Sequence, residues 1–257
     1  KFQVPQKIVI IAIIIILSGY IIFTFPEVGF GLPIGSHGEP YDDWDRLKHK
    51  IVNMENIGAV EITSFEPHLK YILLKTSEKI FDNYFVIPFL SSIGLLIVTY
   101  LFTSKITNSP IAGLLSLIIV LQSNLFLSFD TSGAFASFWV LFYLLSLYFL
   151  IKIFPLSPVF YVFSVFSKTL TVLFAPMSIF FILNSDIPRQ RKIIITLTFL
   201  IIIILGAILS ITQSNIGLEW NQDEFWLGFT AFAFQMRLDS VFVLFLIPVI
   251  VGLFIIS

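Results

Sequence analysis

Apolar runs of nearly twenty residues recur along this chain and constrain its fold more than any other feature. The six clearest runs cover residues 8–24, 84–103, 111–127, 134–151, 193–211 and 240–256. A helix of about 20 apolar residues crosses the roughly 30 Å hydrocarbon layer of a bilayer. Hydrophobic residues make up 57% of the chain and charged residues only 12%, which excludes an ordinary water-soluble domain. We therefore expect an all-α polytopic membrane protein that forms a single module over residues 1–257.

Basic residues indicate how these spans are oriented. Lysine or arginine occurs before the first run, at Lys105, at Lys152 and over residues 189–192. The positive-inside rule places all four sites in the cytoplasm, which requires an even number of crossings between Lys152 and residue 189. We therefore expect residues 157–184 to form a hairpin of two short helices turning near Lys168, for a total of about eight transmembrane helices. The alternative is one long tilted helix with Lys168 extended toward the interface.

A polar stretch over residues 25–82 separates the first two spans, and the same topology makes it extracytoplasmic. It contains ten of the sixteen carboxylates of the chain. Apolar residues spaced by three and four predict interfacial helices over residues 41–54, 67–80 and 223–236, the first with Trp44, Leu47 and Ile51 on its apolar face. The turn around Asp130 and the predicted Lys168 turn lie on this outer face as well.

Four ionisable residues on the outer face are the strongest candidates for chemistry. Asp42 and Asp43 begin a predicted helix, so they are either catalytic carboxylates or N-caps. Asp130 ends an apolar run, where an ionisable side chain usually has a function; the alternative is a capped helix end at the interface. Lys168 is a candidate for phosphate binding, with extension of its side chain to the interface as the alternative.

Other polar residues carry weaker signals. Asp45 and Arg46 fit a solvated helix face, Glu66 fits a cap before Pro67, and residues 223–224 fit partners of a helix dipole. The three histidines lack metal-ligand spacing and the chain has no cysteine, so we expect no metal site and no disulfide. A net charge of −1 gives no indication of a nucleic-acid partner.

The order of these features resembles the GT-C superfamily of integral membrane glycosyltransferases, and within it the protein O-mannosyltransferases and aminoarabinose-type lipid A transferases. Residues 42–46 (Asp-Asp-Trp-Asp-Arg) lie where those enzymes have an acidic pair after the first span. Glu66-Pro67-His68 is similar to their His-Pro-Pro or Glu-Lys-Pro segment. Asp130 matches an acidic residue between the third and fourth spans, and residues 167–169 resemble the tip of their short-helix hairpin.

This resemblance implies a GT-C-like bundle at the cell membrane that moves a sugar from a polyprenyl-phosphate donor to a lipid or protein acceptor on the extracytoplasmic side. It implies Asp42, Asp43 and Asp130 as catalytic carboxylates, and Arg46, Glu66, His68 and Lys168 as substrate-binding residues. It indicates no cofactor, because these two branches are generally treated as metal-independent. Oligosaccharyltransferase relatives within the superfamily use a metal, and the cluster Asp42, Asp43 and Asp45 fits either case. It also implies a further C-terminal part after Ser257.

Two other classes of function fit the same composition. The chain is alternatively a non-catalytic scaffold or accessory subunit of a larger membrane complex that uses the same fold. A transporter or channel is the third class, but charged residues are scarce within the spans and no repeat relates the two halves.

Overall fold

The computed structural model describes residues 5–29, 48, 51, 68–133, 136–185, 187–213, 226 and 230, and the regular structure among them is entirely helical. The prediction of an all-α fold is confirmed for this part of the chain. The elements are α1 (Gln6–Gly29), α3 (His68–Phe81), α4 (Val86–Thr107), α5 (Pro110–Leu121), α6 (Asn124–Phe129), α7 (Phe138–Lys152), η1 (Phe154–Leu156), α8 (Ser157–Ser167), η2 (Thr169–Phe174), α9 (Ala175–Asn184) and α10 (Arg189–Gln213).

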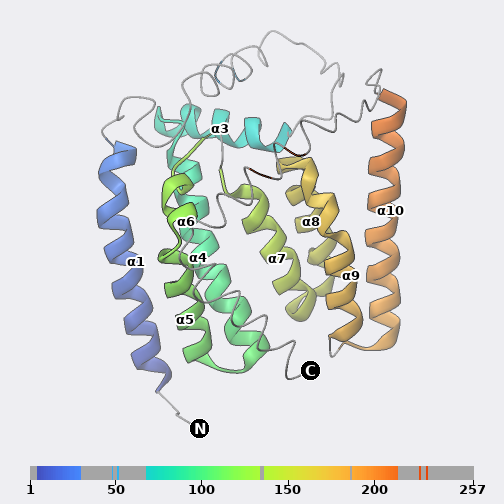
Figure 1. Ribbon diagram of the computed structural model, residues 1–257, viewed down its shortest axis with the longest axis horizontal. Coiled ribbons are helices and arrows are strands. Elements are labelled where there is room, and N and C mark those ends of the chain that lie inside the picture. Colours follow the sequence, from blue (N-terminus) through green and yellow to red (C-terminus); the bar gives the residue numbers. More distant parts are fainter. Residues whose placement is uncertain are drawn as a thin grey trace.

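The helices run up and down side by side, with α1 at one flank and α10 at the other, while α3 lies across one end (Figure 1). We call this end of the bundle the α3 end. The start of α1 and the α4–α5, α7–α8 and α9–α10 connections lie at the opposite end, which we call the basic end. Lys7, Lys105, Lys152 and Arg189 lie in or beside these segments, as the charge pattern predicts.

Two helical segments, Gln6–Pro26 and Val86–Thr107, are long and apolar enough to cross a membrane by length and composition. They correspond to the first two predicted spans, and the 25-residue α10 covers the predicted run 193–211. The predicted run 240–256 lies outside the described residues. Of the predicted helix 223–236, the structure describes Trp226 and Thr230, which are helical.

The predicted continuous span over residues 111–127 is wrong. Helix α5 ends at Leu121, and α6 begins separately at Asn124. Ser123 has an extended backbone and its hydroxyl accepts a hydrogen bond from the Phe126 amide at 3.3 Å. The cause is therefore an N-cap: a serine side chain satisfies a helix-start amide and interrupts the apolar run.

The predicted hairpin over residues 157–184 is confirmed. Helices α8 and α9 are separate and η2 joins them, so the chain reverses direction at the α3 end (Figure 1). Lys168 has φ −156° and ψ 112°, an extended conformation that ends α8. Pro158 and Pro176 occupy the first turns of α8 and α9, where the missing amide hydrogen costs little.

The helix predicted over residues 67–80 is confirmed as α3, within one residue at each end, while its position at a membrane interface stays a prediction. Tyr71, Leu74 and Ser77 form its buried face, whereas Ile72 and Ile80 of the expected apolar stripe are exposed. Of the other predicted helix, residues 41–54, the structure describes Lys48 and Ile51, both helical. Ile51 is buried against Tyr71 and Leu74, as expected for a side chain that faces protein.

Asn83 fastens the corner between α3 and α4 to the end of α1. Its side-chain amide donates to the Val28 carbonyl at 2.6 Å, and its side-chain oxygen accepts from the Phe85 amide at 2.8 Å. Ser77 donates to the Asn83 carbonyl at 2.6 Å. Asp82 allows the sharp exit from α3 with a left-handed φ of 53°. Three helices thus meet at one side-chain amide.

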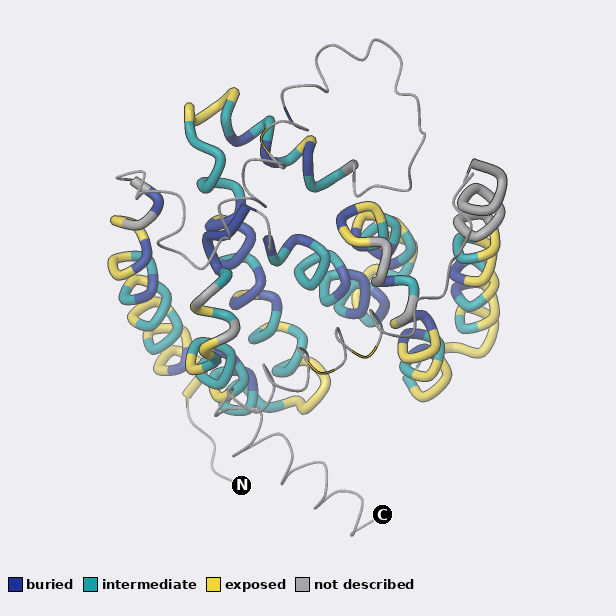
Figure 2. The backbone as a smooth tube through the Cα atoms, turned by 45° about the horizontal axis from the view of Figure 1, so that its top comes forward, coloured by how far each residue is buried: buried dark blue, intermediate teal, exposed yellow. Residues whose placement is uncertain are grey.

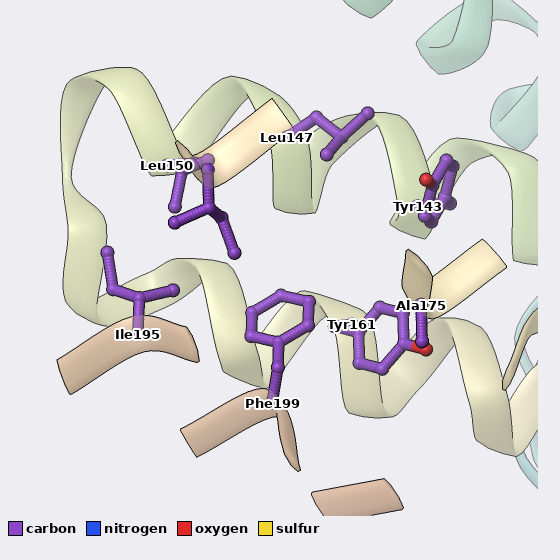
Figure 3. Close-up of a cluster of buried hydrophobic side chains, with 8 residues drawn as sticks. Tyr143, Leu147, Leu150, Tyr161, Ala175, Ile195 and Phe199 are labelled. Atoms are coloured by element: carbon purple, nitrogen blue, oxygen red, sulfur yellow. The ribbon is translucent and has the colours of Figure 1, made fainter. Parts of the chain in front are cut away.

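The main apolar core lies between α7, α8, α9 and α10 (Figure 3). Its centre is a contact between the rings of Tyr161 and Phe199, whose centroids are 4.5 Å apart. A second cluster joins Tyr20 and Val28 of α1 to α4 and α5 through Phe89, Leu96 and Leu117. These two clusters hold the flanking helices α1 and α10 to the bundle.

The outward faces of the bundle are apolar, while several polar side chains are buried inside. Isoleucine and phenylalanine side chains along α1 are exposed, as are isoleucine and leucine side chains along α10, at the two flanks of Figure 2. The interior contains many buried hydroxyl groups, among them Ser92, Ser146, Ser164, Thr171 and Ser178. The exposed apolar flanks differ from the surface of a water-soluble bundle, which presents polar residues to solvent.

Candidate functional site

Asp130 is the predicted catalytic carboxylate for which the structure gives the most detail. It follows α6 as the C-cap residue and is only 4% exposed. The negative end of a helix dipole disfavours a carboxylate, so a capping role does not account for this position. Burial of such a polar group is costly unless it forms hydrogen bonds.

Two helices from elsewhere in the sequence supply hydrogen bonds to Asp130. The Tyr20 hydroxyl of α1 donates to Asp130 Oδ2 at 2.7 Å, and the Ser92 hydroxyl of α4 donates to the Asp130 carbonyl at 2.5 Å. The hydroxyl of Ser137, which precedes α7, lies 3.2 Å from the Ser92 hydroxyl. Because Ser92 already donates its proton to the Asp130 carbonyl, Ser137 is the donor in this pair. Asp130 therefore joins α1, α4 and the start of α7.

Thr131 and Ser132 extend this polar turn into the interior. Both are buried, and the Ser132 amide donates to the Phe129 carbonyl at 3.3 Å. Together with Tyr20, Ser92 and Asp130 they form a buried polar cluster near the α3 end, where α4 begins. The cluster thus holds a carboxylate in a fixed orientation, with the phenol hydroxyl of Tyr20 as its hydrogen-bond donor.

Lys168 lies at the hairpin tip at the α3 end and is exposed. Its ammonium group lies 5.3 Å from the centroid of the Trp139 ring, a favourable cation–π geometry. Trp139 in turn stacks on Phe174, with centroids 5.8 Å apart, and its carbonyl accepts from Ser164 at 2.6 Å. An exposed cation on an aromatic platform is able to bind an anion such as a phosphate.

A set of hydroxyl groups fixes the backbone beneath this tip. Ser178 donates to the Tyr143 hydroxyl at 3.1 Å, and that hydroxyl donates to the Phe174 carbonyl at 3.4 Å. Thr171 donates to the Ser164 carbonyl at 3.4 Å, and its own carbonyl accepts from Tyr161 at 3.5 Å. These contacts hold η2 against α7, α8 and α9, and Lys168 directly precedes η2.

Most of the other predicted site residues are not among the residues that the structure describes. Asp42, Asp43, Arg46 and Glu66 lie outside the described residues, and His68 is the first residue of α3. The prediction that Asp42 or Asp43 shares one cavity with Asp130 and Lys168 stays a prediction. Within the described residues, no group of three or more His, Asp or Glu side chains is arranged to hold a metal ion.

Sequence reasoning missed Tyr20 and Ser92, which form the hydrogen bonds to Asp130. Tyr20 is one of three residues with a hydroxyl group in the first apolar run, with Ser18 and Thr24, and these hydroxyl groups were a signal that one face of this helix packs against protein. The pairing of Tyr20 with Asp130 could not be predicted from the sequence, because 110 residues separate them. Comparison with known proteins adds no assignment: no protein-family model, curated protein or solved structure matches this chain.

Proposed function

We propose that this chain is the transmembrane module of a glycosyltransferase that moves a sugar from a polyprenyl-phosphate donor to an extracytoplasmic acceptor. The observation that carries the proposal is the position of Asp130 and Lys168 at the same end of the bundle as α3. An acid and a phosphate-binding cation on one end of a lipid-embedded bundle are the two groups that this reaction needs first.

Membrane embedding of the whole bundle, and not only of two helices, is the first step of the argument. The exposed isoleucine, leucine and phenylalanine side chains of α1, α9 and α10 would form an apolar surface far larger than water-soluble proteins tolerate. Buried serine and threonine hydroxyls between helices are typical of membrane bundles, where they bond across helix contacts. Both features support a multi-pass protein.

Orientation is the second step. Lys7, Lys105, Lys152 and the arginines of α10 share the basic end, and the positive-inside rule assigns that end to the cytoplasm. The α3 end is then extracytoplasmic in a cell membrane. Asp130 and Lys168 would thus act where the donor lipid presents its sugar.

The chemistry assigns a role to each group. A carboxylate of Asp42 or Asp43 takes the proton of the acceptor hydroxyl, whose oxygen then bonds to the anomeric carbon of the sugar. The bond from that carbon to the phosphate oxygen breaks, and polyprenyl phosphate leaves with the bonding electrons. Lys168 stabilises the charge that develops on that phosphate. Asp130, which accepts a hydrogen bond from Tyr20, lines the same site.

One observation favours the second candidate function, a non-catalytic membrane scaffold. The Asp130 carboxylate is buried and already accepts a hydrogen bond from Tyr20, which is what a structural joint between α1 and the bundle requires. In that case the polar cluster around Asp130 holds helices together and has no substrate. Transfer activity separates the two candidates.

The test uses the full-length protein in liposomes, with polyprenyl-phosphate mannose or aminoarabinose carrying a labelled sugar. Lys168→Ala should lower the transfer rate by about 10²-fold, the effect of losing one stabilising group at the leaving-group charge. Lys168→Arg should retain most of the rate, and Lys79→Ala, an exposed lysine of α3, should leave it unchanged.

Substitution of Asp42 and Asp43 is the stricter test in the same assay. The double variant Asp42→Asn with Asp43→Asn should abolish transfer while the helical circular dichroism and the unfolding temperature stay at the parental values. Transfer at the parental rate in this double variant would reject Asp42 and Asp43 as the base. Absence of transfer by the parental protein itself would reject the enzyme and leave the scaffold as the function.

A further inference from the structure

The basic end of the bundle carries a cluster of cations that the reaction at the α3 end does not use. Lys152 ends α7, while Arg189 and Arg191 begin α10, and all three side chains are exposed. Arg191 lies over the ring of Phe154, with its guanidinium carbon 5.0 Å from the centroid. Since Phe154 is only two residues after Lys152, this contact brings the two connections together. We call Lys152, Arg189 and Arg191 the basic rim.

Two of the rim cations lie near aromatic rings, and all three are exposed to solvent. Lys152 lies 5.8 Å from the centroid of Tyr148, and Arg191 contacts Phe154 as described. In the part of the chain that the structure describes, no carboxylate forms an ion pair with these three side chains. Asp186 is the nearest acid in the sequence, and it lies outside the described residues.

Helix polarity makes this arrangement unfavourable without an anion. The first turn of α10 contains no acidic residue, yet it carries Arg189, Arg191 and Lys192 at the positive end of its dipole. Lys192 is already used, because its ammonium group donates to the Leu183 carbonyl at 2.6 Å and caps α9. Arg191, which lies over Phe154, remains available beside Lys152, with planar guanidinium donors that match phosphate oxygens, and Arg189 lies in the same first turn of α10.

The surroundings of the rim select the kind of anion. Ile153, Leu156 and Leu183 are exposed apolar side chains in the same two connections. Cations bordered by exposed apolar side chains fit a molecule that has both an anionic phosphate and acyl chains. A free inorganic anion would gain nothing from that apolar border.

From these contacts we infer that the basic rim is a binding site for the headgroup of an anionic phospholipid. The phosphate lies against Lys152, Arg189 and Arg191, and the acyl chains follow the exposed apolar surface of α9 and α10. The bound headgroup bridges the α7–α8 and α9–α10 connections. It also favours the orientation in which this end of the bundle lies in the leaflet that is rich in anionic lipid. The inference does not depend on sugar transfer.

The test measures lipid retention by the purified full-length protein in nanodiscs and by native mass spectrometry. The probes are phosphatidylglycerol and phosphatidylcholine with identical acyl chains. The parental protein should retain phosphatidylglycerol preferentially. Lys152→Gln with Arg191→Gln should lower that preference by about 25-fold, since each cation near an anionic surface contributes roughly 1 kcal/mol, or about fivefold.

Matched variants separate a defined site from a diffuse positive surface. Lys105→Gln removes an exposed charge in the last turn of α4, at the same end of the bundle but outside the α7–α8 and α9–α10 connections, and it should leave the preference within about twofold. Lys152→Arg with Arg191→Lys keeps both charges and should restore retention if the glutamine variant fails to fold. An equal loss from Lys105→Gln, no preference for phosphatidylglycerol, or equal thermal stabilisation by inorganic phosphate alone would each overturn the inference.

Discussion

The two sides of this bundle are held together in different ways. On the side of α1, α4 and α5, the contacts most exposed to a single substitution are the carboxylate–phenol bond and a close helix contact at Gly113. On the side of α7, α8 and α9, many neutral hydroxyl bonds and ring contacts overlap. The ring of Phe160, for example, lies 4.9 Å from Phe149 and 6.0 Å from Phe163.

The difference teaches where a single substitution matters. A joint that depends on one buried polar pair fails when either partner is lost, because the other is left buried with fewer bonds. A joint of overlapping neutral bonds loses little when one is removed, because the remaining groups find other partners. We therefore expect unequal sensitivity on the two sides, and the following variants test it in order of decreasing effect.

Tyr20→Phe should have the largest effect on stability. It removes the phenol donor from the buried Asp130 carboxylate, and we expect a loss of about 2 kcal/mol in the free energy of unfolding. The measurement is equilibrium unfolding in mixed micelles. The double variant with Asp130→Asn should be less than additive, as coupled groups are. Additive losses would show that the two side chains are not coupled.

Gly113→Ala should come next, with a loss of about 1–2 kcal/mol from overpacking between α4 and α5. An added Cβ would lie 2.7 Å from the Tyr100 carbonyl oxygen and 2.9 Å from Ser104 Cβ, so the two helices must separate. Gly94→Ala is the matched control, because its Cβ would meet only Leu141 at 3.5 Å. Equal unfolding free energies for the two variants would reject the close contact.

Tyr143→Phe should have the smallest effect, about 0.6 kcal/mol, the average for such bonds in membrane bundles. Its hydroxyl accepts from Ser178 and donates to the Phe174 carbonyl, and Ser178 Oγ lies only 3.2 Å from that carbonyl, so in the variant the serine can donate to it instead. The same unfolding assay applies, with Tyr20→Phe as the reference. Equal losses for the two tyrosines would remove the distinction between the two sides.

Part of this architecture was readable in the sequence, for physical reasons that differ by region. The basic residues 189–192 required an even number of crossings, and that predicted the hairpin of α8 and α9. Pro67 and the spacing of apolar residues predicted α3. The break at Ser123 was missed because serine is tolerated within apolar spans, and only its capping bond to Phe126 marks a helix start.

The polar cluster around Asp130 shows why the rest was not readable. Helix α1 is apolar on every side, so its sequence does not indicate which face meets the bundle. The position of Tyr20 opposite Asp130 depends on how α1 is rotated and where it docks, which the packing of Phe89 and Leu117 decides. The residues 42 and 43, which the sequence placed at the same end, lie outside the described part of the chain.

The Asn83 corner has a consequence for how this chain can change during evolution. By holding Val28 next to the exit from α3, it fixes the two points between which the polar stretch leaves and returns. The entropic cost of closing a chain segment between fixed ends grows only by about 0.6 kcal/mol for each doubling of its length. A change in length that leaves the contact of Ile51 with Tyr71 and Leu74 in place should therefore cost the bundle little, so the stretch can acquire or lose specificities while the helices stay unchanged.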